Sequence, residues 1–369
     1  MSHIKILTGN CLDTLKSIPE KSINTCVTSP PYWGLRDYGT GEWQGGDPDC
    51  PHMRTTKISK DTSTGHKAMF EQGNVVGDAI YKKKCPECGA VRKDNQLGLE
   101  ETPEKFVENL LNVFREVKRV LRDDGTVWLN LGDSYCGTGH KGDHIDPKHK
   151  DARTGQKVAL NNKVQGLKSK DLVGIPWRVA FALQADGWYL RQDIIWHKPN
   201  PMPESVTDRC TKSHEYIFLL SKNAKYYYDN EAIKEKAVGE RWGGNNPINM
   251  RNTKDIDNQF SGLTRERKML YDEKNKRSVW TITPKSFKEA HFATFPIDLI
   301  EPCILAGCPE NGTVLDPFGG SGTVGLASNG HNRNSVLCEL NPEYVKIATD
   351  RIELEAGGMF TTVEVVTND

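Results

Sequence analysis

Residues 314–325 are Val314-Leu315-Asp316-Pro317-Phe318-Gly319-Gly320-Ser321-Gly322-Thr323-Val324-Gly325, an apolar run followed by a glycine-rich turn and a helical pattern. Glycines in such a turn let the backbone approach a ligand closely, and an acidic residue at the strand end accepts hydrogen bonds from ammonium or hydroxyl groups. Glu339 closes the next apolar run, 23 residues after Asp316, a spacing that suits a carboxylate bound to ribose hydroxyls. Because the turn lacks the lysine of a phosphate-binding loop, the pattern predicts an adenosine-bearing ligand without a pyrophosphate. For the glycines alone, a tight strand-to-helix turn with a solvated Glu339 is the alternative.

Apolar runs and helical periodicities alternate around this turn, which predicts an α/β fold with a mostly parallel sheet. The expected strands are residues 4–7, 25–28, 126–131, 193–196, 215–220, 313–315 and 335–338. The expected helices are residues 103–121, 172–185, 296–305 and 342–355, the first with Thr102 as N-cap and Pro103 at its first position. Residues 40–100 and 233–279 break the alternation, and we expect them to be insertions.

A second motif, Thr28-Ser29-Pro30-Pro31-Tyr32-Trp33, follows one of the expected strands. Its two prolines fix the backbone and remove two N–H donors, so carbonyls and the Ser29 hydroxyl are left as acceptors beside an aromatic ring. Such a turn can accept hydrogen bonds from an amino group while the ring stacks on a planar base. A rigid surface turn without a ligand is the alternative.

Together, the two motifs resemble those of the DNA amino-methyltransferases. The catalytic motif of that family is (Ser/Asp/Asn)-Pro-Pro-(Tyr/Phe), and its cofactor, S-adenosylmethionine (SAM), lies over a Phe-x-Gly-x-Gly turn. The catalytic motif comes first and the cofactor motif last, as in the β group with its circular arrangement. Further matches follow in the same order and are Leu7-Thr8-Gly9-Asn10, Leu131-Gly132-Asp133-Ser134, Ile195-Trp196-His197-Lys198-Pro199-Asn200-Pro201, His214-Glu215-Tyr216 and His291-Phe292-Ala293-Thr294-Phe295-Pro296. The resemblance implies a Rossmann-like sheet of the SAM-dependent methyltransferase type, with circularly arranged motifs.

The resemblance also implies which residues contact the base and which hold the cofactor. Asn10 stands where many members of the family carry Asp. The implied catalytic residues are Ser29, Pro30, Pro31 and Tyr32, and the implied cofactor-binding residues are Asn10, Asp316, Phe318, Gly320, Ser321, Gly322, Thr323 and Glu339.

The chemistry of an exocyclic amine explains the catalytic motif, because the amine lone pair is delocalised into the ring and is a poor nucleophile. We expect the Ser29 hydroxyl and the Pro30 carbonyl to accept hydrogen bonds from the amine of a base flipped out of double-stranded DNA, with Tyr32 stacked on the ring. Ser at the first position is commoner among cytosine-N4 enzymes of the family, so that base is favoured and adenine-N6 is the alternative. From a different class of protein, a catalytically decayed DNA-binding protein is the alternative.

Four residues with the spacing of metal ligands lie in the first insertion, within Cys50-Pro51-His52 and Cys85-Pro86-Glu87-Cys88-Gly89. A Cys-x-x-Cys-Gly turn lets the thiolates of Cys85 and Cys88 face one ion, and Cys50 with His52 completes a tetrahedral set. The pattern predicts a structural Zn²⁺ site in an inserted lobe. Four unrelated residues, or a redox pair of cysteines, are the alternatives.

The charges cancel over the whole chain, with 49 Lys and Arg against 49 Asp and Glu, but not within its regions. Residues 138–170 hold 8 basic residues against 3 acidic ones, residues 205–285 hold 16 against 11, and residues 301–369 hold 3 against 10. This distribution predicts a mobile basic loop at 138–170 and DNA contacts from that loop and from the segment 233–285. The resemblance implies that residues 233–279 are the target-recognition region, with a solvated surface insertion as the alternative. The candidate DNA-binding residues are Lys141, Lys148, Lys150, Arg153, Arg241, Arg251, Arg265 and Arg267.

The expected organisation is a catalytic core of residues 1–39, 101–232 and 280–369, with a zinc-binding lobe at 40–100 and the target-recognition region at 233–279. Ten cysteines are too sparse for a disulfide scaffold, the start has no signal-peptide pattern, and no apolar run is long enough for a membrane span. We therefore expect a cytoplasmic protein of a bacterial or phage-infected cell. Its expected partner is double-stranded DNA, and we expect no association with a membrane. A homodimer is one candidate assembly, because dimers are common in the β group.

DNA binding is expected to weaken steeply with salt, because neutralisation of phosphates by Lys and Arg releases counterions. If six or more phosphates are contacted, raising salt from about 50 to 200 mM should lower the association constant by about 10³-fold or more. Fluorescence anisotropy on a labelled duplex measures this change. An affinity that does not depend on salt would contradict the assignment of the basic segments.

Overall fold

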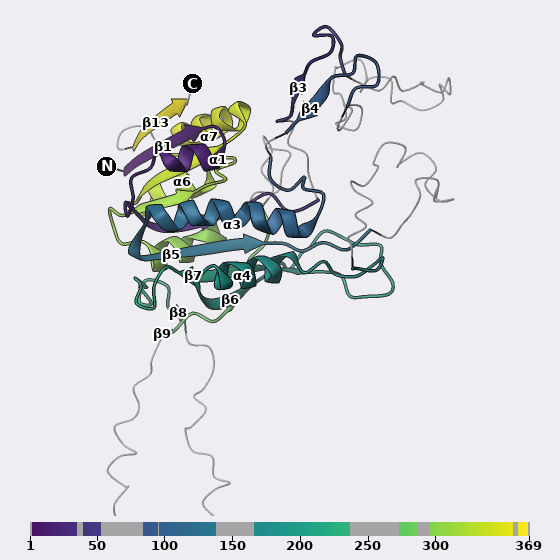
Figure 1. Ribbon diagram of the computed structural model, residues 1–369. Coiled ribbons are helices and arrows are strands. Elements are labelled where there is room, and N and C mark those ends of the chain that lie inside the picture. The colour runs from purple at the N-terminus through teal and green to yellow at the C-terminus, as the bar shows by residue number, and fades with distance from the viewer. Residues whose placement is uncertain are drawn as a thin grey trace, which may run out of the picture.

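Nine strands form one central sheet among the residues that the structure describes (Figure 1). The computed structural model describes residues 2–34, 40–52, 84–94, 96–137, 166–236, 273–285, 295–356 and 361–367. Neighbouring strands are parallel except at β7, which runs antiparallel to both β5 and β6. The order across the sheet is β10 (Val279–Thr281), β6 (Tyr189–His197), β7 (His214–Ser221), β5 (Leu121–Leu131), β2 (Ile23–Thr28), β11 (Thr313–Asp316), β12 (Asn334–Glu339), β1 (Ser2–Thr8) and β13 (Thr361–Thr367).

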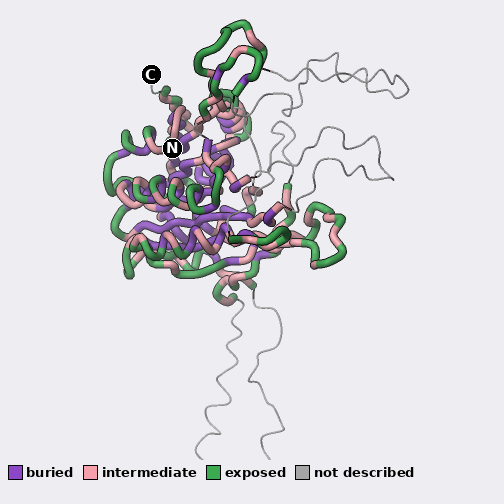
Figure 2. Tube along the Cα trace, turned by 45° about the vertical axis from the view of Figure 1, so that its right-hand side comes forward, coloured by how far each residue is buried: buried purple, intermediate pink, exposed green. Residues whose placement is uncertain are grey.

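Helices cover both faces of the sheet and make a three-layer α/β fold, which confirms the fold class expected from the sequence. One apolar core joins the sheet to α1 (Cys11–Lys16), α3 (Pro103–Val120) and α4 (Ile175–Ala185). A second core joins it to α5 (Ile297–Gly307), α6 (Thr323–Gly330) and α7 (Pro342–Glu355). The buried part of the chain follows the strands, and exposed residues lie on the outer surfaces of the helices (Figure 2).

Local signals in the sequence determine where the best-predicted helices begin. The Thr102 side chain accepts a hydrogen bond from the Lys105 N–H at 3.2 Å, and Pro103 fills the first position of α3. Asn341 caps α7 in the same way, with Pro342 at the first position. The helices expected at 103–121 and 342–355 are confirmed. The helix expected at 172–185 begins later, at Ile175, because Gly174 adopts a left-handed conformation that ends the extended segment before it.

All seven strands expected from the sequence are present, and two further strands at the edges of the sheet were not predicted. β13 pairs with β1, but its half-exposed residues give no apolar run. β10 has three residues and pairs with β6. Both strands form because a neighbouring strand offers its free edge, and local sequence patterns do not show where such an edge lies.

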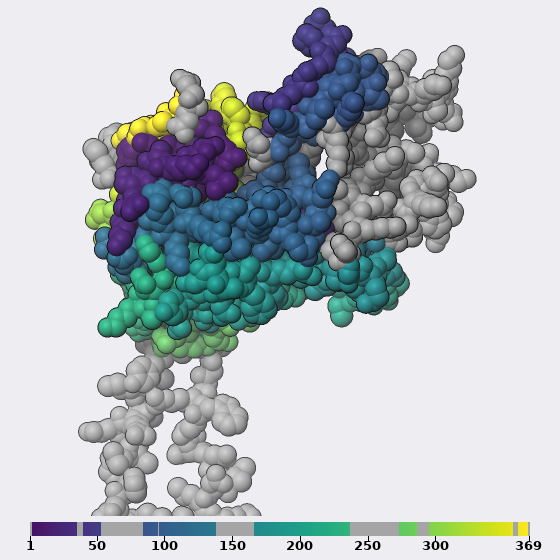
Figure 3. All heavy atoms as spheres, in the orientation of Figure 1, coloured from purple at the N-terminus to yellow at the C-terminus, as the bar shows by residue number. Residues whose placement is uncertain are grey.

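The first insertion carries a short hairpin of β3 (Glu42–Gln44) and β4 (Val91–Lys93), which stands out from the body of the molecule (Figure 3). In the second insertion, β8 (Glu235–Lys236) pairs with β9 (Glu273–Lys274). Over the described ranges, each helix is either too short or too polar to pass through a lipid bilayer.

Candidate active site

A cavity of about 690 Å³ opens where the parallel strands end. Its wall includes the residues that end or follow β11, β12, β1 and β2, which are neighbours in the sheet. Open α/β sheets bind their ligands at this edge, outside the carboxyl ends of the strands. Every catalytic and cofactor-binding residue expected from the sequence lines this cavity, with the exception of Gly322.

Both the backbone conformation at Gly322 and its close packing require glycine at this position. Its φ is +77°, and a Cβ atom there would lie 3.0 Å from the Cβ of Ala348 in α7. The residue therefore lets the glycine-rich turn pack against α7 as α6 begins. Gly320 faces the cavity instead, and its N–H donates to Glu339 Oε2 at 2.8 Å.

Two carboxylates, the buried Asp316 that ends β11 and the half-buried Glu339 that ends β12, give the cavity an acidic wall. Asp316 is only 1% exposed and accepts hydrogen bonds from Thr28 Oγ1 at 2.6 Å and from the Phe318 N–H at 3.0 Å. Burial raises the pKa of Asp316 to about 7. Burial also raises the pKa of Glu339, although the N–H groups of Asn341 and Gly320 stabilise its ionised form. A bound ammonium or sulfonium group would offset the free-energy cost of ionising these carboxyls away from water.

Arg351 of α7 holds the glycine-rich turn from behind. Its Nη1 donates to the Ser321 carbonyl at 3.2 Å, to Ser321 Oγ at 3.3 Å and to Thr323 Oγ1 at 3.0 Å. The sequence assigned Ser321 and Thr323 to the cofactor, and in the structure both residues line the cavity while their hydroxyls accept hydrogen bonds from Arg351. No motif marked Arg351, because its position in a helical pattern gave no indication that it reaches a turn 30 residues earlier.

The Ser-Pro-Pro-Tyr turn leaves β2 at the same edge. Ser29 Oγ donates to Asn130 Oδ1 of β5 at 3.3 Å, and the Tyr32 hydroxyl donates to Glu215 Oε2 of β7 at 2.7 Å. A Cβ atom at Gly132 would lie 2.5 Å from the Tyr32 ring, so only glycine leaves room for the ring there. The orientation of Tyr32 is thus fixed at its hydroxyl and at its ring edge.

The segment after the β3–β4 hairpin forms another part of the wall and was not predicted to. The Gly34 N–H donates to the Gly98 carbonyl at 2.8 Å, and Trp33 Nε1 donates to the Glu100 carbonyl at 3.0 Å. Residues 96–100 therefore pack against the Ser-Pro-Pro-Tyr turn although they lie within the range assigned to the inserted lobe.

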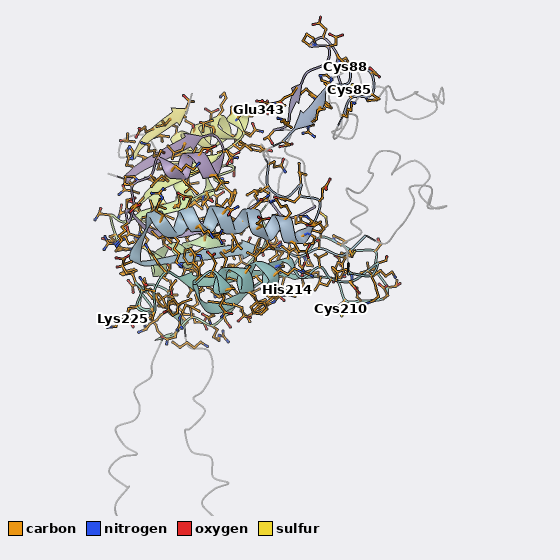
Figure 4. The ribbon with its side chains drawn as sticks, in the orientation of Figure 1. Cys85, Cys88, Cys210, His214, Lys225 and Glu343 are labelled. Atoms are coloured by element: carbon orange, nitrogen blue, oxygen red, sulfur yellow. The ribbon has the colours of Figure 1, made fainter. Side chains whose placement is uncertain are left out.

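The four expected metal ligands, Cys50, His52, Cys85 and Cys88, meet in the hairpin with ligand atoms within 4.8 Å of one another. Cys50 Sγ lies 3.7 Å from Cys85 Sγ, and Cys88 Sγ lies 3.4 Å from His52 Nδ1. The His52 ring stacks on Trp43 of β3, with centroids 4.3 Å apart. Figure 4 shows Cys85 and Cys88 together in the hairpin, away from the central sheet.

The candidate DNA-binding residues lie outside the described part of the chain. Lys141, Lys148, Lys150 and Arg153 fall within 138–165, and Arg241, Arg251, Arg265 and Arg267 fall within 237–272.

Comparison with known proteins decides the family. Residues 23–350 match the family model N6_N4_Mtase, described as DNA methylase. The chain belongs to this family of DNA methylases. The matched range includes both the Ser-Pro-Pro-Tyr turn and the glycine-rich turn that line the cavity.

Curated relatives of this DNA methylase are type II methyltransferases. The chain is 41% identical over 347 residues to the type II methyltransferase M.Cfr9I of Citrobacter freundii, an alignment that covers 94% of this chain and 87% of the relative. It is 39% identical over 349 residues to M.SmaI of Serratia marcescens, covering 94% of this chain and 90% of the relative.

Solved structures share the fold of this DNA methylase. A putative DNA modification methylase of Thermus thermophilus, TTHA0409, complexed with SAM, matches with a TM-score of 0.53 and 19% identity over 99% of this chain and 98% of that one. The cytosine-N4-specific PvuII DNA methyltransferase matches with a TM-score of 0.54 and 16% identity over 99% of this chain and 95% of that one. Both confirm the methyltransferase-type α/β sheet expected from the sequence.

Replacing Asp316 by Asn should stabilise the ligand-free DNA methylase at high pH, because Asn keeps the acceptor for Thr28 and Phe318 but carries no buried charge. Because the pKa of Asp316 is raised in the folded state, the protonated carboxyl stabilises the fold fully below pH 3.8, the ordinary pKa of the group. This stabilisation is lost as the pH rises to about 7. At pH 8, urea denaturation should show the variant about 2–4 kcal/mol more stable, since one pKa unit corresponds to about 1.4 kcal/mol. The difference should shrink towards pH 4, and a difference independent of pH would refute the assignment.

Proposed function

We propose that this DNA methylase transfers a methyl group from SAM to the exocyclic amine of a base flipped out of double-stranded DNA, with the N4 amine of cytosine as the favoured target. The hydrogen bond from Thr28 Oγ1 to Asp316 Oδ1, at 2.6 Å, carries the proposal. It joins the residue before the Ser-Pro-Pro-Tyr turn to the residue before the glycine-rich turn. A methyl donor on one turn and an amine on the other would therefore lie in one cavity, as direct transfer requires.

The residues of the glycine-rich half fit SAM. The buried Asp316 and the half-buried Glu339 are acidic groups that suit a cationic ligand with ribose hydroxyls, and Gly320 lets the backbone approach it. Phe318 and Asn10 line the same part of the wall. When bound, SAM supplies an electrophilic methyl group.

The catalytic half supplies acceptors and a stacking surface for the base. In the proposed mechanism, Ser29 Oγ and the Pro30 carbonyl accept hydrogen bonds from the amine, so that its lone pair faces the methyl group. Tyr32 stacks on the ring, and its contacts with Glu215 and Gly132 fix its orientation in advance. The basic loop at 138–170 and the region at 233–279 are proposed to contact the DNA.

Nucleoside analysis tests the reaction and the target base. Unmodified DNA is incubated with enzyme and SAM, digested to nucleosides and analysed by mass spectrometry. We expect N4-methylcytosine, whereas N6-methyladenine would assign the alternative base. A protein that binds SAM and DNA but forms no methylated nucleoside would be the decayed DNA-binding protein instead.

Replacing Ser29 by Ala should lower kcat by about 10- to 100-fold, because a hydrogen bond made to the reacting amine is lost. SAM binding, measured by calorimetry, should be unchanged. Ser22→Ala, at an exposed serine just before the same strand, is the matched control and should retain full turnover. Full turnover of the Ser29 variant would remove the assignment of this residue.

We also propose that Cys50, His52, Cys85 and Cys88 bind a structural Zn²⁺ ion. Tetrahedral zinc with bonds of about 2.3 Å to sulfur separates its ligand atoms by roughly 3.5–3.8 Å. The distances of 3.7 Å between Cys50 and Cys85 and 3.4 Å between Cys88 and His52 are close to this geometry. Because β3 and β4 have only three residues each, a metal would supply much of the stability of the lobe.

Metal analysis of the purified protein should find about one Zn²⁺ per chain, and Cys85→Ser should lose it, because three ligands bind zinc more weakly than four. Cys210→Ser is the matched control, since Cys210 is exposed and lies outside the hairpin, as Figure 4 shows. The control should keep its zinc. Wild-type protein without stoichiometric zinc would refute the site.

A further inference from the structure

A third group of side chains lines the cavity beside the two motifs. Asn130 belongs to β5, Glu215 to β7, and Lys198 follows β6 directly. β7 is antiparallel to its neighbours, so Glu215, near its first residue, lies at the edge where the other strands end. The side chains of Lys198 and Glu215 are only 20% and 17% exposed.

The Glu215 carboxylate connects the aromatic ring of the catalytic turn to a cation. Its Oε2 accepts hydrogen bonds from the Tyr32 hydroxyl at 2.7 Å and from Asn130 Nδ2 at 3.3 Å. Its Oε1 forms an ion pair with Lys198 Nζ. One carboxylate therefore fixes both the ring of Tyr32 and the head group of Lys198.

Lys198 places a positively charged hydrogen-bond donor in the cavity wall that it shares with Ser29 and Tyr32. Its Nζ lies 4.1 Å from the ring centroid of Trp196, and both residues line the cavity together with Ser29 and Tyr32. An ammonium group has three N–H donors, and the ion pair with Glu215 needs one of them. The stacking surface, the acceptors and this donor are thus held around one space.

The hydrogen-bonding edge of a nucleobase is complementary to these acceptors and to the Lys198 donor. Beside the exocyclic amine of cytosine stands a ring nitrogen acceptor, followed by a carbonyl oxygen, and enzymes read a flipped base through this edge. We propose that Lys198 donates a hydrogen bond to these acceptors of the flipped base, and that Glu215 is a positioning residue that orients Lys198 and Tyr32. The proposal rests on the proposed function, because it names residues that recognise the substrate of that reaction.

A contact from Lys198 to a DNA phosphate is the competing explanation, because lysine commonly binds phosphates. Two observations disfavour it. The ammonium is already paired with the Glu215 carboxylate, which cancels most of its attraction for a second anion. Its position over Trp196 also keeps it in the cavity wall beside Tyr32.

Binding to two DNA duplexes separates these explanations. One duplex carries the target base in a mismatch, which favours flipping, and the other has an abasic site at the same position. We expect Lys198→Met to bind the base-containing duplex about 10- to 100-fold more weakly than wild type, the value of a charge-assisted hydrogen bond. Both proteins should bind the abasic duplex equally well, because it offers no ring to contact.

Two further variants test the positioning role and control for loss of a lysine beside a tryptophan. Glu215→Gln should lower kcat more than it raises KM for DNA, and combining it with Lys198→Met should add little to the effect of Lys198→Met alone. Lys118→Met is the matched control, since Lys118 Nζ lies 5.4 Å from the Trp188 ring, and Lys118 does not line the cavity. The control should bind both duplexes as wild type does.

Equal weakening of both duplexes by Lys198→Met would assign Lys198 to the DNA backbone and overturn the proposal. Unchanged binding of the base-containing duplex would also overturn it. Additive effects of the Glu215 and Lys198 variants would refute the positioning role of Glu215. Failure of the proposed function is recognised separately, because wild-type enzyme would then form no methylated nucleoside.

Discussion

The hydrogen bond between Thr28 and Asp316 joins two segments that are 288 residues apart in the chain. It forms because β2 and β11 are parallel neighbours, with Val314 opposite Thr25 and Leu315 opposite Cys26, so both strands end at the same edge. The turn that carries the acceptors for an amine and the turn that suits a cationic ligand must then open into one cavity. If β2 paired elsewhere in the sheet, each turn would keep its local sequence and lose its partner, and the chain would have no site for direct group transfer.

Further contacts within the protein hold the residues around this bond in place. Arg351 holds the glycine-rich turn through the Ser321 carbonyl and the hydroxyls of Ser321 and Thr323. Glu215 and Gly132 fix the Tyr32 ring from two sides. Such preorganisation reduces the entropy lost when substrates are aligned. It has a cost, because ionisation of the buried Asp316 carboxyl destabilises the ligand-free fold as the pH rises through its raised pKa of about 7.

Much of the fold could be predicted from local patterns, and the limits of that prediction have identifiable causes. α3 begins where Thr102 and Pro103 indicate, and it buries its apolar face at the expected spacing. The edge strands β10 and β13 were missed because β10 has only three residues, β13 has no buried residue, and the pairing of each depends on a distant strand. The cysteine spacing predicted the metal-ligand cluster because two chelating pairs are short-range patterns. The role of residues 96–100 in the cavity wall was missed, because it arises from contacts with Trp33 and Gly34.

The sequence by itself determined the family, the two motifs, the strand-and-helix alternation and most of the residues that line the cavity, because each depends on neighbours within a few positions of the chain. Only the tertiary structure decided that Gly322 packs on α7, that Arg351 donates to the hydroxyls of Ser321 and Thr323, and that Glu215 links Tyr32 to Lys198. The physical reason is the same in each case. Hydrogen bonds and close packing act over a few ångströms in space, and only the order of strands in the sheet brings these distant residues within that range.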